Sequence, residues 1–108
     1  MPDYHEHSDL NSLGEFAKLA GPEFEGFVAL NSGSSERRTH HAEIPELMSI
    51  AVACTTQCPY CLDVHTAGAK RAGATREEVA EAIFVSAALR AGAAVTHGTL
   101  ALKLFDRK

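Results

Sequence analysis

Two cysteines and a histidine in the stretch TTQCPYCLDVH, residues 55–65, have the types and spacing needed for thiol chemistry. Cys58 and Cys61 are three positions apart, and His65 follows four positions after Cys61. Because side chains three and four positions apart share one face of a helix, a helix here would align all three groups in one stripe. Such a stripe supplies a reactive thiolate, a second thiol that can close a disulfide on it, and an imidazole that can take or relay a proton.

The helix that carries this stripe is expected to begin at the first cysteine. Pro59 disfavours helical geometry at the residue before it, so the helix starts at Cys58 or Pro59. The positive end of a helix stabilises a thiolate, and this local argument favours Cys58 as the thiol with the lower pKa. A C-x-x-C pair at a helix start is a recurring arrangement in thiol-redox proteins, and the following histidine makes the pattern more specific.

Two other interpretations use the same residues. A zinc site would take the two cysteines and the histidine of the stripe, with a fourth ligand from elsewhere in the chain: Glu46, Cys54 or His97. Structural zinc sites usually draw their remaining ligands from a second cysteine or histidine pair, which this sequence lacks. The other interpretation packs these small residues in a core, and we adopt it for Cys54, because a buried cysteine often acts as a small hydrophobe.

The composition is that of one globular domain spanning residues 1–108. Hydrophobic residues make up 45% of the chain, but aromatic residues only 6%, so the core must be built from Ala, Leu, Val and Ile. The net charge of −4 argues against a nucleic-acid-binding protein, which needs a basic surface. A solvated loop is the better explanation for the small basic patch formed by Arg37, Arg38, His40 and His41.

The sequence also bears on the compartment. It contains no uninterrupted apolar run of about 18 residues, so no membrane span is expected. The N-terminus is polar and acidic, without the apolar segment of a signal peptide, and we expect a cytoplasmic protein. Three clustered cysteines in a reducing compartment indicate metal binding or redox chemistry rather than a disulfide framework.

Helical signals cover most of the chain and predict an all-α bundle of five or six helices. Residues 1–8 are expected to form a loose tail, and Tyr4, His5 and His7 are assigned to it rather than to a ligand set. A polar loop is expected over residues 31–43. The expected helices are 9–20, 22–32, 44–54, 58–73, 76–92 and 93–108.

The helix that starts near residue 76 carries two informative signals. Thr75 and Glu78 form a capping box at its start. Beyond its first turn the helix is apolar on most sides, and a helix that is apolar all round is normally buried. Because a chain of 108 residues has difficulty covering such a helix, we expect contacts between subunits to cover it. Gly92 is expected to mark a break or a close crossing.

The run ELMSIAVACTTQCPYCLDVH, followed by GATREEVAEAI and AGAAVTH, resembles the alkylhydroperoxidase D-like family of the carboxymuconolactone decarboxylase superfamily. The redox signature of that family is a glutamate, eleven residues, a cysteine, two residues, a second cysteine, three residues and a histidine. Glu46, Cys58, Cys61 and His65 match this spacing position for position. The resemblance covers residues 44–104, the expected core of the domain.

The resemblance implies a role for each residue of the signature. Cys61 would be the thiolate that attacks a hydroperoxide, and Cys58 would resolve it to a disulfide. Glu46 and His65 would relay the proton, so the helices that carry them must pack side by side. Tyr60 stands where the well-studied peroxidase branch has a second histidine, and a phenol with a pKa near 10 is a poorer proton shuttle at neutral pH.

The resemblance also implies a class of enzyme and its partners. It implies a thiol-dependent peroxidase or disulfide oxidoreductase that needs no cofactor, metal or flavin. The reductant would be a lipoyl or thioredoxin-like dithiol, and the chain would form a homotrimer or homohexamer. The alternatives are a metal-binding or interaction module with the same fold, or a carboxymuconolactone decarboxylase-like enzyme. His97 is an accessory candidate in a context similar to a family position near the active site, although packing against a neighbouring subunit also explains it.

Overall fold

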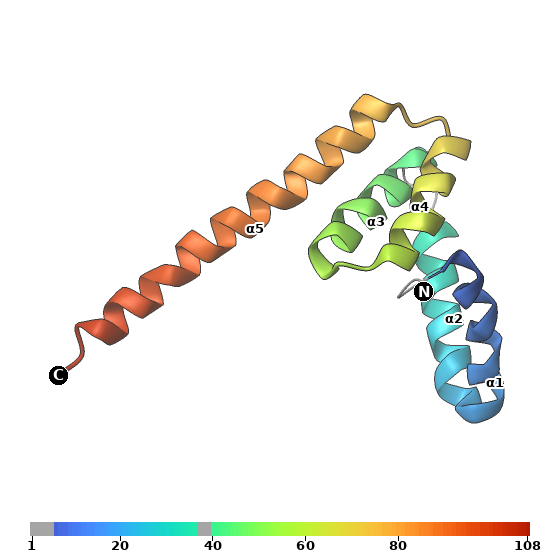
Figure 1. Ribbon diagram of the computed structural model, residues 1–108, viewed down its shortest axis with the longest axis horizontal. Coiled ribbons are helices and arrows are strands. Elements are labelled where there is room, and N and C mark those ends of the chain that lie inside the picture. Colours follow the sequence, from blue (N-terminus) through green and yellow to red (C-terminus); the bar gives the residue numbers. More distant parts are fainter. Residues whose placement is uncertain (1–5, 37–39) are drawn as a thin grey trace.

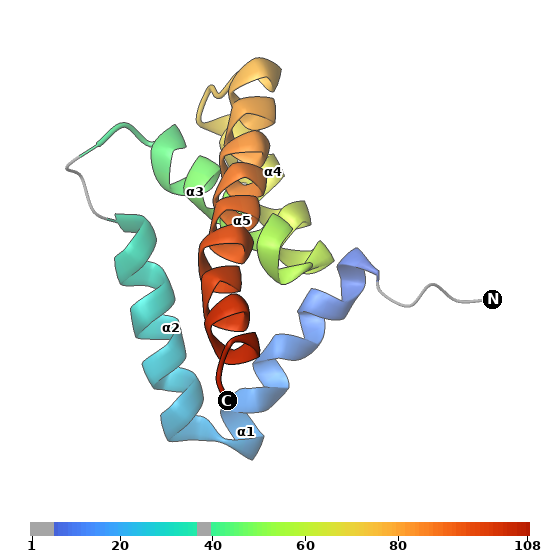
Figure 2. The same ribbon diagram turned by 90° about the vertical axis from the view of Figure 1, so that its left-hand side faces the viewer.

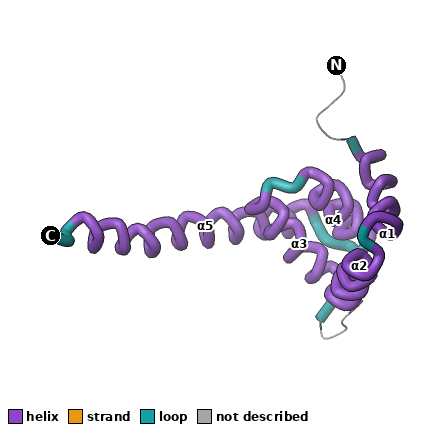
Figure 3. The backbone as a smooth tube through the Cα atoms, turned by 90° about the horizontal axis from the view of Figure 1, so that it is seen from below, coloured by secondary structure: helices purple, strands orange, loops and turns teal. Residues whose placement is uncertain are grey.

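The computed structural model describes residues 6–36 and 40–108, and within this part of the chain every regular element is a helix (Figure 3). The predicted all-α fold class is confirmed. The first element, η1, is a 3-10 helix, and the others are α-helices (Figure 1). In chain order they are η1 His7–Glu15, α1 Phe16–Leu19, α2 Gly21–Glu36, α3 Glu43–Thr56, α4 Pro59–Arg71 and α5 Arg76–Phe105.

The helix α3 is the centre of the fold, because it packs against both α4 and α5. Its inner face carries Ile50 and Ala53, whose exposed fractions are 1% and 3%. Ala69 on α4 is completely buried, and Ser86 on α5 is 8% exposed. Three of these four side chains are small, which lets the helix axes approach closely. The tight core therefore lies on the helix that also carries Glu46.

The N-terminal helices form a second layer beside this core. The η1–α1 segment and α2 form the two arms of a V that meet near α1 (Figure 2), and α1 contacts both η1 and α2. Aromatic side chains join the two arms, since the ring centroids of Phe16 and Phe24 are 6.4 Å apart. The η1 helix also contacts α4, so the N-terminal layer touches the helix that carries the cysteines.

Local signals set the boundaries of α4 and the start of α5 as predicted. Gly73, with a positive φ of 93°, follows the end of α4. The amide of Ala74 donates to the Ala69 carbonyl and the amide of Gly73 to the Lys70 carbonyl, which is the Schellman pattern of a helix end. At the start of α5, the capping box between Thr75 and Glu78 is confirmed in both directions.

The N-terminal boundaries differ from the prediction. Regular structure begins at His7 rather than at residue 9, because the side chain of Asp9 accepts a hydrogen bond from the Glu6 amide and closes the first turn. The α2 helix continues to Glu36, so residues 31–36 are helical instead of belonging to a polar loop. Four residues of the sequence-based assignments lie outside the described part of the chain: Tyr4, His5, Arg37 and Arg38.

The expected break at Gly92 is wrong, since α5 is one helix of 30 residues. A glycine inside a helix costs only about 1 kcal/mol relative to alanine, and the alanines around it favour the helix. Within the described residues nothing lies within 4 Å of a β-carbon built at Gly92, so none of the described elements crosses there. The predicted pair of C-terminal helices is therefore a single long rod that extends beyond α3 (Figures 1 and 3).

The projecting rod gives the chain more surface than a compact monomer. The chain exposes 8849 Å², whereas a folded monomer of its mass exposes about 5,800 Å². The radius of gyration is 18.1 Å, against about 13 Å for a compact domain of this length. Large apolar side chains on α5 account for part of the excess: Phe84, Val85, Leu89, Val95, Leu102 and Phe105.

The composition of α5 also modifies the sequence-based statement about membranes. By length and apolar content this helix could cross a bilayer, with a mean hydropathy of 1.5 in its most apolar window, although such a match is weak evidence. Arg90 lies at the midpoint of the helix, where a charged side chain in a bilayer costs about 2.5–3.5 kcal/mol. The excess surface is comparable to the area buried in obligate protein interfaces. We therefore propose that further copies of this chain cover α5.

In sedimentation equilibrium we expect the purified protein to have a mass of at least twice the 11.5 kDa of one chain. Val95→Asp should lower the association constant by at least tenfold, because it places a charge in an apolar contact while valine and aspartate have similar helix propensities. Asn11→Asp adds the same charge at an exposed polar position on η1 and should leave the mass unchanged. A monomer at about 100 μM, or partition of the parent chain into lipid vesicles, would contradict the proposal.

Candidate active site

A tight turn between α3 and α4 delivers the first cysteine to a helix start. The α3 helix ends at Thr56, and Gln57 adopts the left-handed conformation, with φ 57° and ψ 48°. Cys58 then takes an extended conformation as the N-cap residue of α4, with Pro59 at the first helical position. The proline ring is compatible with the first turn of a helix but disfavours helical geometry at the preceding residue. The predicted start of the cysteine-bearing helix is confirmed.

The two thiols of the C-x-x-C pair interact directly. The backbone N–H of Cys61 donates to Sγ of Cys58 at 3.2 Å. The pKa of the Cys58 thiol is lowered from its ordinary value of 9.0, chiefly by the hydrogen bond from the Cys61 side chain and then by the backbone N–H of Cys61. The same contact, together with burial, raises the pKa of Cys61 to about 11. As the pH rises, the first thiolate of the pair therefore forms on Cys58, and the Cys61 thiol keeps its proton to a higher pH.

A carboxylate–imidazole pair joins α3 to α4 beside the thiols. Oε2 of Glu46, on α3, lies 2.8 Å from Nδ1 of His65, on α4, and both side chains are largely buried. A carboxylate at Nδ1 favours the tautomer that carries its proton there, which leaves Nε2 as an acceptor. The pair can therefore take up a proton at Nε2 while Glu46 stabilises the resulting imidazolium.

Gly68 makes room for this pair, and the sequence analysis did not single it out. It lies on α4 three positions after His65 and is buried. A β-carbon at this position would lie 2.5 Å from Oε2 of Glu46 and 2.7 Å from its Cδ, well inside contact distance. The available signal was a glycine inside a helix, near a candidate histidine and away from any turn.

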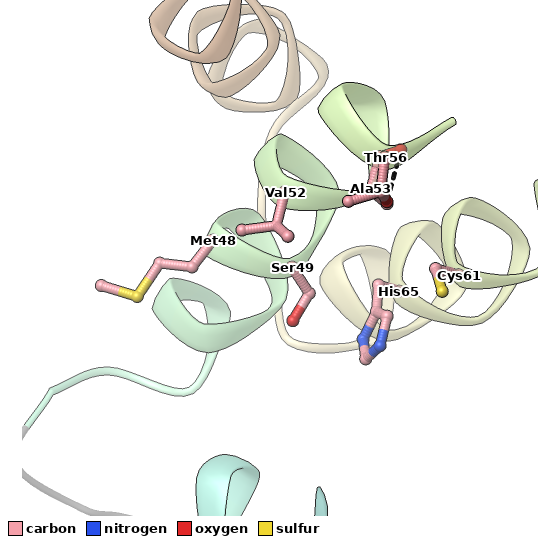
Figure 4. Close-up of a pocket in the computed structure, with 7 residues that line it drawn as sticks. All are labelled: Met48, Ser49, Val52, Ala53, Thr56, Cys61 and His65. Atoms are coloured by element: carbon pink, nitrogen blue, oxygen red, sulfur yellow. Dashed lines mark hydrogen bonds between the residues drawn. The ribbon is translucent and has the colours of Figure 1, made fainter. Parts of the chain in front are cut away.

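An open pocket of about 290 Å³ lies between α3 and α4. Figure 4 shows the sulfur of Cys61 and the imidazole of His65 projecting from successive turns of α4 on one side. The α3 side of the pocket is mostly apolar, and the Ser49 hydroxyl is bonded to the Pro45 carbonyl of its own helix. The residues that line the pocket are Met48, Ser49, Val52, Ala53, Thr56, Cys61 and His65. The pocket therefore suits a small organic molecule that meets Cys61 and His65.

The structure places the other candidate residues outside this pocket. The Tyr60 hydroxyl donates to Oδ2 of Asp9 on η1 at 2.6 Å, so this side chain turns toward the N-terminal layer. His97 lies on the projecting half of α5 and borders a different surface depression, formed by that helix alone. Cys54 is a partly buried free thiol on α3. His7 belongs to η1 instead of a tail, and its Nδ1 lies 2.6 Å from Oδ2 of Asp63.

The geometry also bears on the zinc interpretation. Over residues 6–36 and 40–108, no three histidine, cysteine, aspartate or glutamate side chains are grouped so that they could hold a metal ion. The stripe on α4 brings two thiols and an imidazole to one side of a helix, and Glu46 is bonded to Nδ1 of that imidazole. The arrangement that the described side chains do form is a dithiol beside a proton-accepting pair.

Comparison with known proteins gave one family match and several relatives. The model of the carboxymuconolactone decarboxylase family matches residues 28–104. A protein described as uncharacterized protein 4 in the cox locus of Paracoccus denitrificans is 40% identical over 100 residues, which cover 88% of this chain and 86% of that protein. An uncharacterized protein of Haemophilus influenzae is 36% identical over 106 residues, covering 96% of this chain and 94% of that protein.

Gly68→Ala should separate Glu46 from His65 without unfolding the protein, because the end of a flexible side chain can move away from the new methyl group. The nitrogen-15 chemical shifts of the His65 ring are expected to lose the signature of a hydrogen-bonded Nδ1. Gly92→Ala is the matched control, since its methyl group meets nothing within 4 Å. An unchanged His65 spectrum in Gly68→Ala would show that the glycine does not accommodate the pair.

The pH dependence of alkylation by iodoacetamide should show that Cys58 is the more reactive thiol. At a given pH near neutrality, a thiol with a lowered pKa has a larger thiolate fraction than an ordinary thiol. Cys58 should therefore react with an apparent pKa below 9.0. In Cys58→Ser, the pKa of the remaining Cys61 should fall from its raised value of about 11, because Cys58 is the main cause of the increase. Peptide mass spectrometry identifies the modified residue, and preferential labelling of Cys61 at pH 7 would reverse this order.

Proposed function

The chain belongs to the carboxymuconolactone decarboxylase family, and from that premise we propose that it is a thiol-dependent peroxidase of the alkylhydroperoxidase D type. The match over residues 28–104 confirms the resemblance to this superfamily that the sequence indicated. Family membership is compatible with more than one chemistry, so the proposal depends on the residues of the site. It assigns the chain the reduction of small hydroperoxides in the cytoplasm.

One observation carries the proposal: Cys61 of the C-x-x-C pair and His65 of the Glu–His pair line the same pocket. Sγ of Cys58 accepts the Cys61 N–H at 3.2 Å, and Nδ1 of His65 lies 2.8 Å from Glu46. A dithiol can deliver two electrons to a peroxide by forming a disulfide, and the imidazole can handle the proton. A decarboxylase of the same family would give the cysteine pair no evident task.

The proposed cycle begins with Cys61, because it lines the pocket where a peroxide would enter. Its proton passes to His65, and the thiolate attacks the terminal oxygen of ROOH. The O–O bond breaks, the alkoxide takes a proton and leaves as ROH, and Cys61 becomes a sulfenic acid. Cys58 then loses its proton and attacks this sulfur; the S–S bond forms as the S–O bond breaks, and the departing hydroxide takes that proton and leaves as water. An external dithiol reduces the disulfide and is itself oxidised.

The raised pKa of Cys61 explains why this mechanism needs a base. A thiol with a pKa of about 11 is almost fully protonated at neutral pH. In the proposal, His65 removes the proton only when the substrate is in place, and Glu46 stabilises the imidazolium that forms. The neighbouring Cys58, the more readily ionised of the two thiols, then resolves the sulfenic acid. The two thiols thus differ in acidity at the start of the cycle.

The partners in the proposal follow from the pocket and from the family resemblance. A largely apolar pocket of about 290 Å³ favours a small organic hydroperoxide over a macromolecule. A lipoyl or thioredoxin-like dithiol is the proposed reductant, since it can reach a disulfide at an exposed helix start. A homotrimer or homohexamer is the proposed assembly, in keeping with the exposed apolar surface of α5.

Thiol titration of the reduced protein before and after peroxide tests this cycle. We expect two of the three thiols per chain to disappear, with Cys54 retained. Cys61→Ser should reduce peroxide consumption by at least a hundredfold, whereas Cys58→Ser should stop at a sulfenic acid that dimedone traps. Cys54→Ser is the control and should behave like the parent. If Cys61→Ser consumes peroxide at the parent rate, Cys61 is not the attacking residue.

A further inference from the structure

Two polar contacts fasten η1 to the first turns of α4. The Tyr60 hydroxyl donates to Oδ2 of Asp9 at 2.6 Å. Nδ1 of His7 lies 2.6 Å from Oδ2 of Asp63, one turn further along α4. We call these two contacts the η1–α4 clamp. They join residues more than fifty positions apart. They add specific polar contacts to the packing of η1 against α4.

The clamp holds the same turn that stabilises the Cys58 thiolate. Tyr60 lies between the two cysteines, and its backbone N–H, like that of Cys61, lowers the pKa of Cys58. The N–H groups of this turn point at the sulfur only while the turn keeps helical geometry. Helix ends fray readily, because their first N–H groups have no partners within the helix. A tether on the second residue of α4 opposes this fraying.

Asp9 is itself held in place on the other side of the clamp. Its Oδ2 also accepts the backbone N–H of Glu6 at 2.7 Å, and this bond belongs to the capping box at the start of η1. The acceptor of the Tyr60 hydroxyl is therefore part of an ordered helix start. Asp63 carries a second contact on the same side of α4, so the tether has two attachment points.

We propose that Tyr60 is a positioning residue, which through its hydroxyl and Asp9 holds the first turn of α4 in the geometry that stabilises the Cys58 thiolate. The proposal deepens the proposed function and rests on it for its catalytic meaning, but its test needs neither peroxide nor reductase. It gives Tyr60 a task different from proton shuttling. It also makes η1, which lies outside the stretch that resembles the family, a part of the site.

Tyr60→Phe removes only the hydroxyl and is the primary test. We expect the pKa of Cys58, measured by iodoacetamide alkylation, to rise so that the thiolate fraction at pH 7 falls about threefold to tenfold, the effect of one modest hydrogen bond. The equilibrium of the dithiol with glutathione disulfide should shift toward the protein disulfide by a similar factor, because the reduced form has lost stabilisation. An unchanged pKa in a folded Tyr60→Phe protein would overturn the proposal.

Asp9→Ala separates the clamp from a simple charge effect. Removing a nearby carboxylate by itself favours a thiolate and would lower the pKa of Cys58, whereas loss of the clamp should raise it. A lowered pKa in Asp9→Ala would therefore count against the clamp. Thr75→Ala is the matched control for stability, since it removes a helix cap remote from the thiols. It should lower the melting temperature and leave the pKa of Cys58 unchanged.

These readouts also distinguish a failure of this inference from a failure of the proposed function. If Tyr60→Phe raises the pKa of Cys58 but the parent chain consumes no peroxide, the clamp stands and the peroxidase proposal fails. If the parent chain consumes peroxide and Tyr60→Phe leaves both the pKa and the glutathione equilibrium unchanged, the peroxidase proposal stands and the clamp fails.

Discussion

The close packing of α3 on α4 is the constraint on which the rest of the site depends. Small buried side chains at Ala53 and Ala69 let these helices approach, and Ile50 on α3 is buried in the same core. The close packing of the two helices brings Glu46 within hydrogen-bond distance of His65. It also forms the pocket, of which each helix supplies one wall. Gly68 shows how little room remains, because even one methyl group there would displace the Glu46 carboxylate.

The turn at Gln57 and Cys58 then fixes what the packed helices can do. Since the turn is short, the dithiol must lie at the end of α4 that adjoins the end of α3, while the Glu–His pair lies further along both helices. Cys58 and Cys61 divide their ionisation unequally, one with a lowered pKa and the other with a raised pKa. Two chemically identical side chains thus differ in pKa because of their positions at a helix start.

Local signals in the sequence were sufficient for part of this arrangement. The capping box at Thr75, the helix end at Gly73 and the helix start at Pro59 each depend on a few adjacent residues, and each was predicted. The break expected at Gly92 was wrong, because a helix propensity deficit of about 1 kcal/mol does not by itself end a helix.

Contacts between distant residues were less accessible from the sequence. The pairing of Glu46 with His65 was expected from a family resemblance, since no local pattern joins α3 to α4. The bond between Tyr60 and Asp9 spans 51 positions and left no sequence signal. The space at Gly68 became evident only when both helices were in place, because it is defined by the side chain of another element.

The length of α5 has a consequence for the life of the newly made chain. The α3–α4 hairpin consists of neighbouring segments, and such local contacts form quickly during folding. The candidate active site can therefore be complete before the projecting half of α5 is covered in the proposed assembly. Until then each chain presents an apolar rod to chaperones and proteases, so its survival depends on the rate of synthesis and the local concentration of other chains.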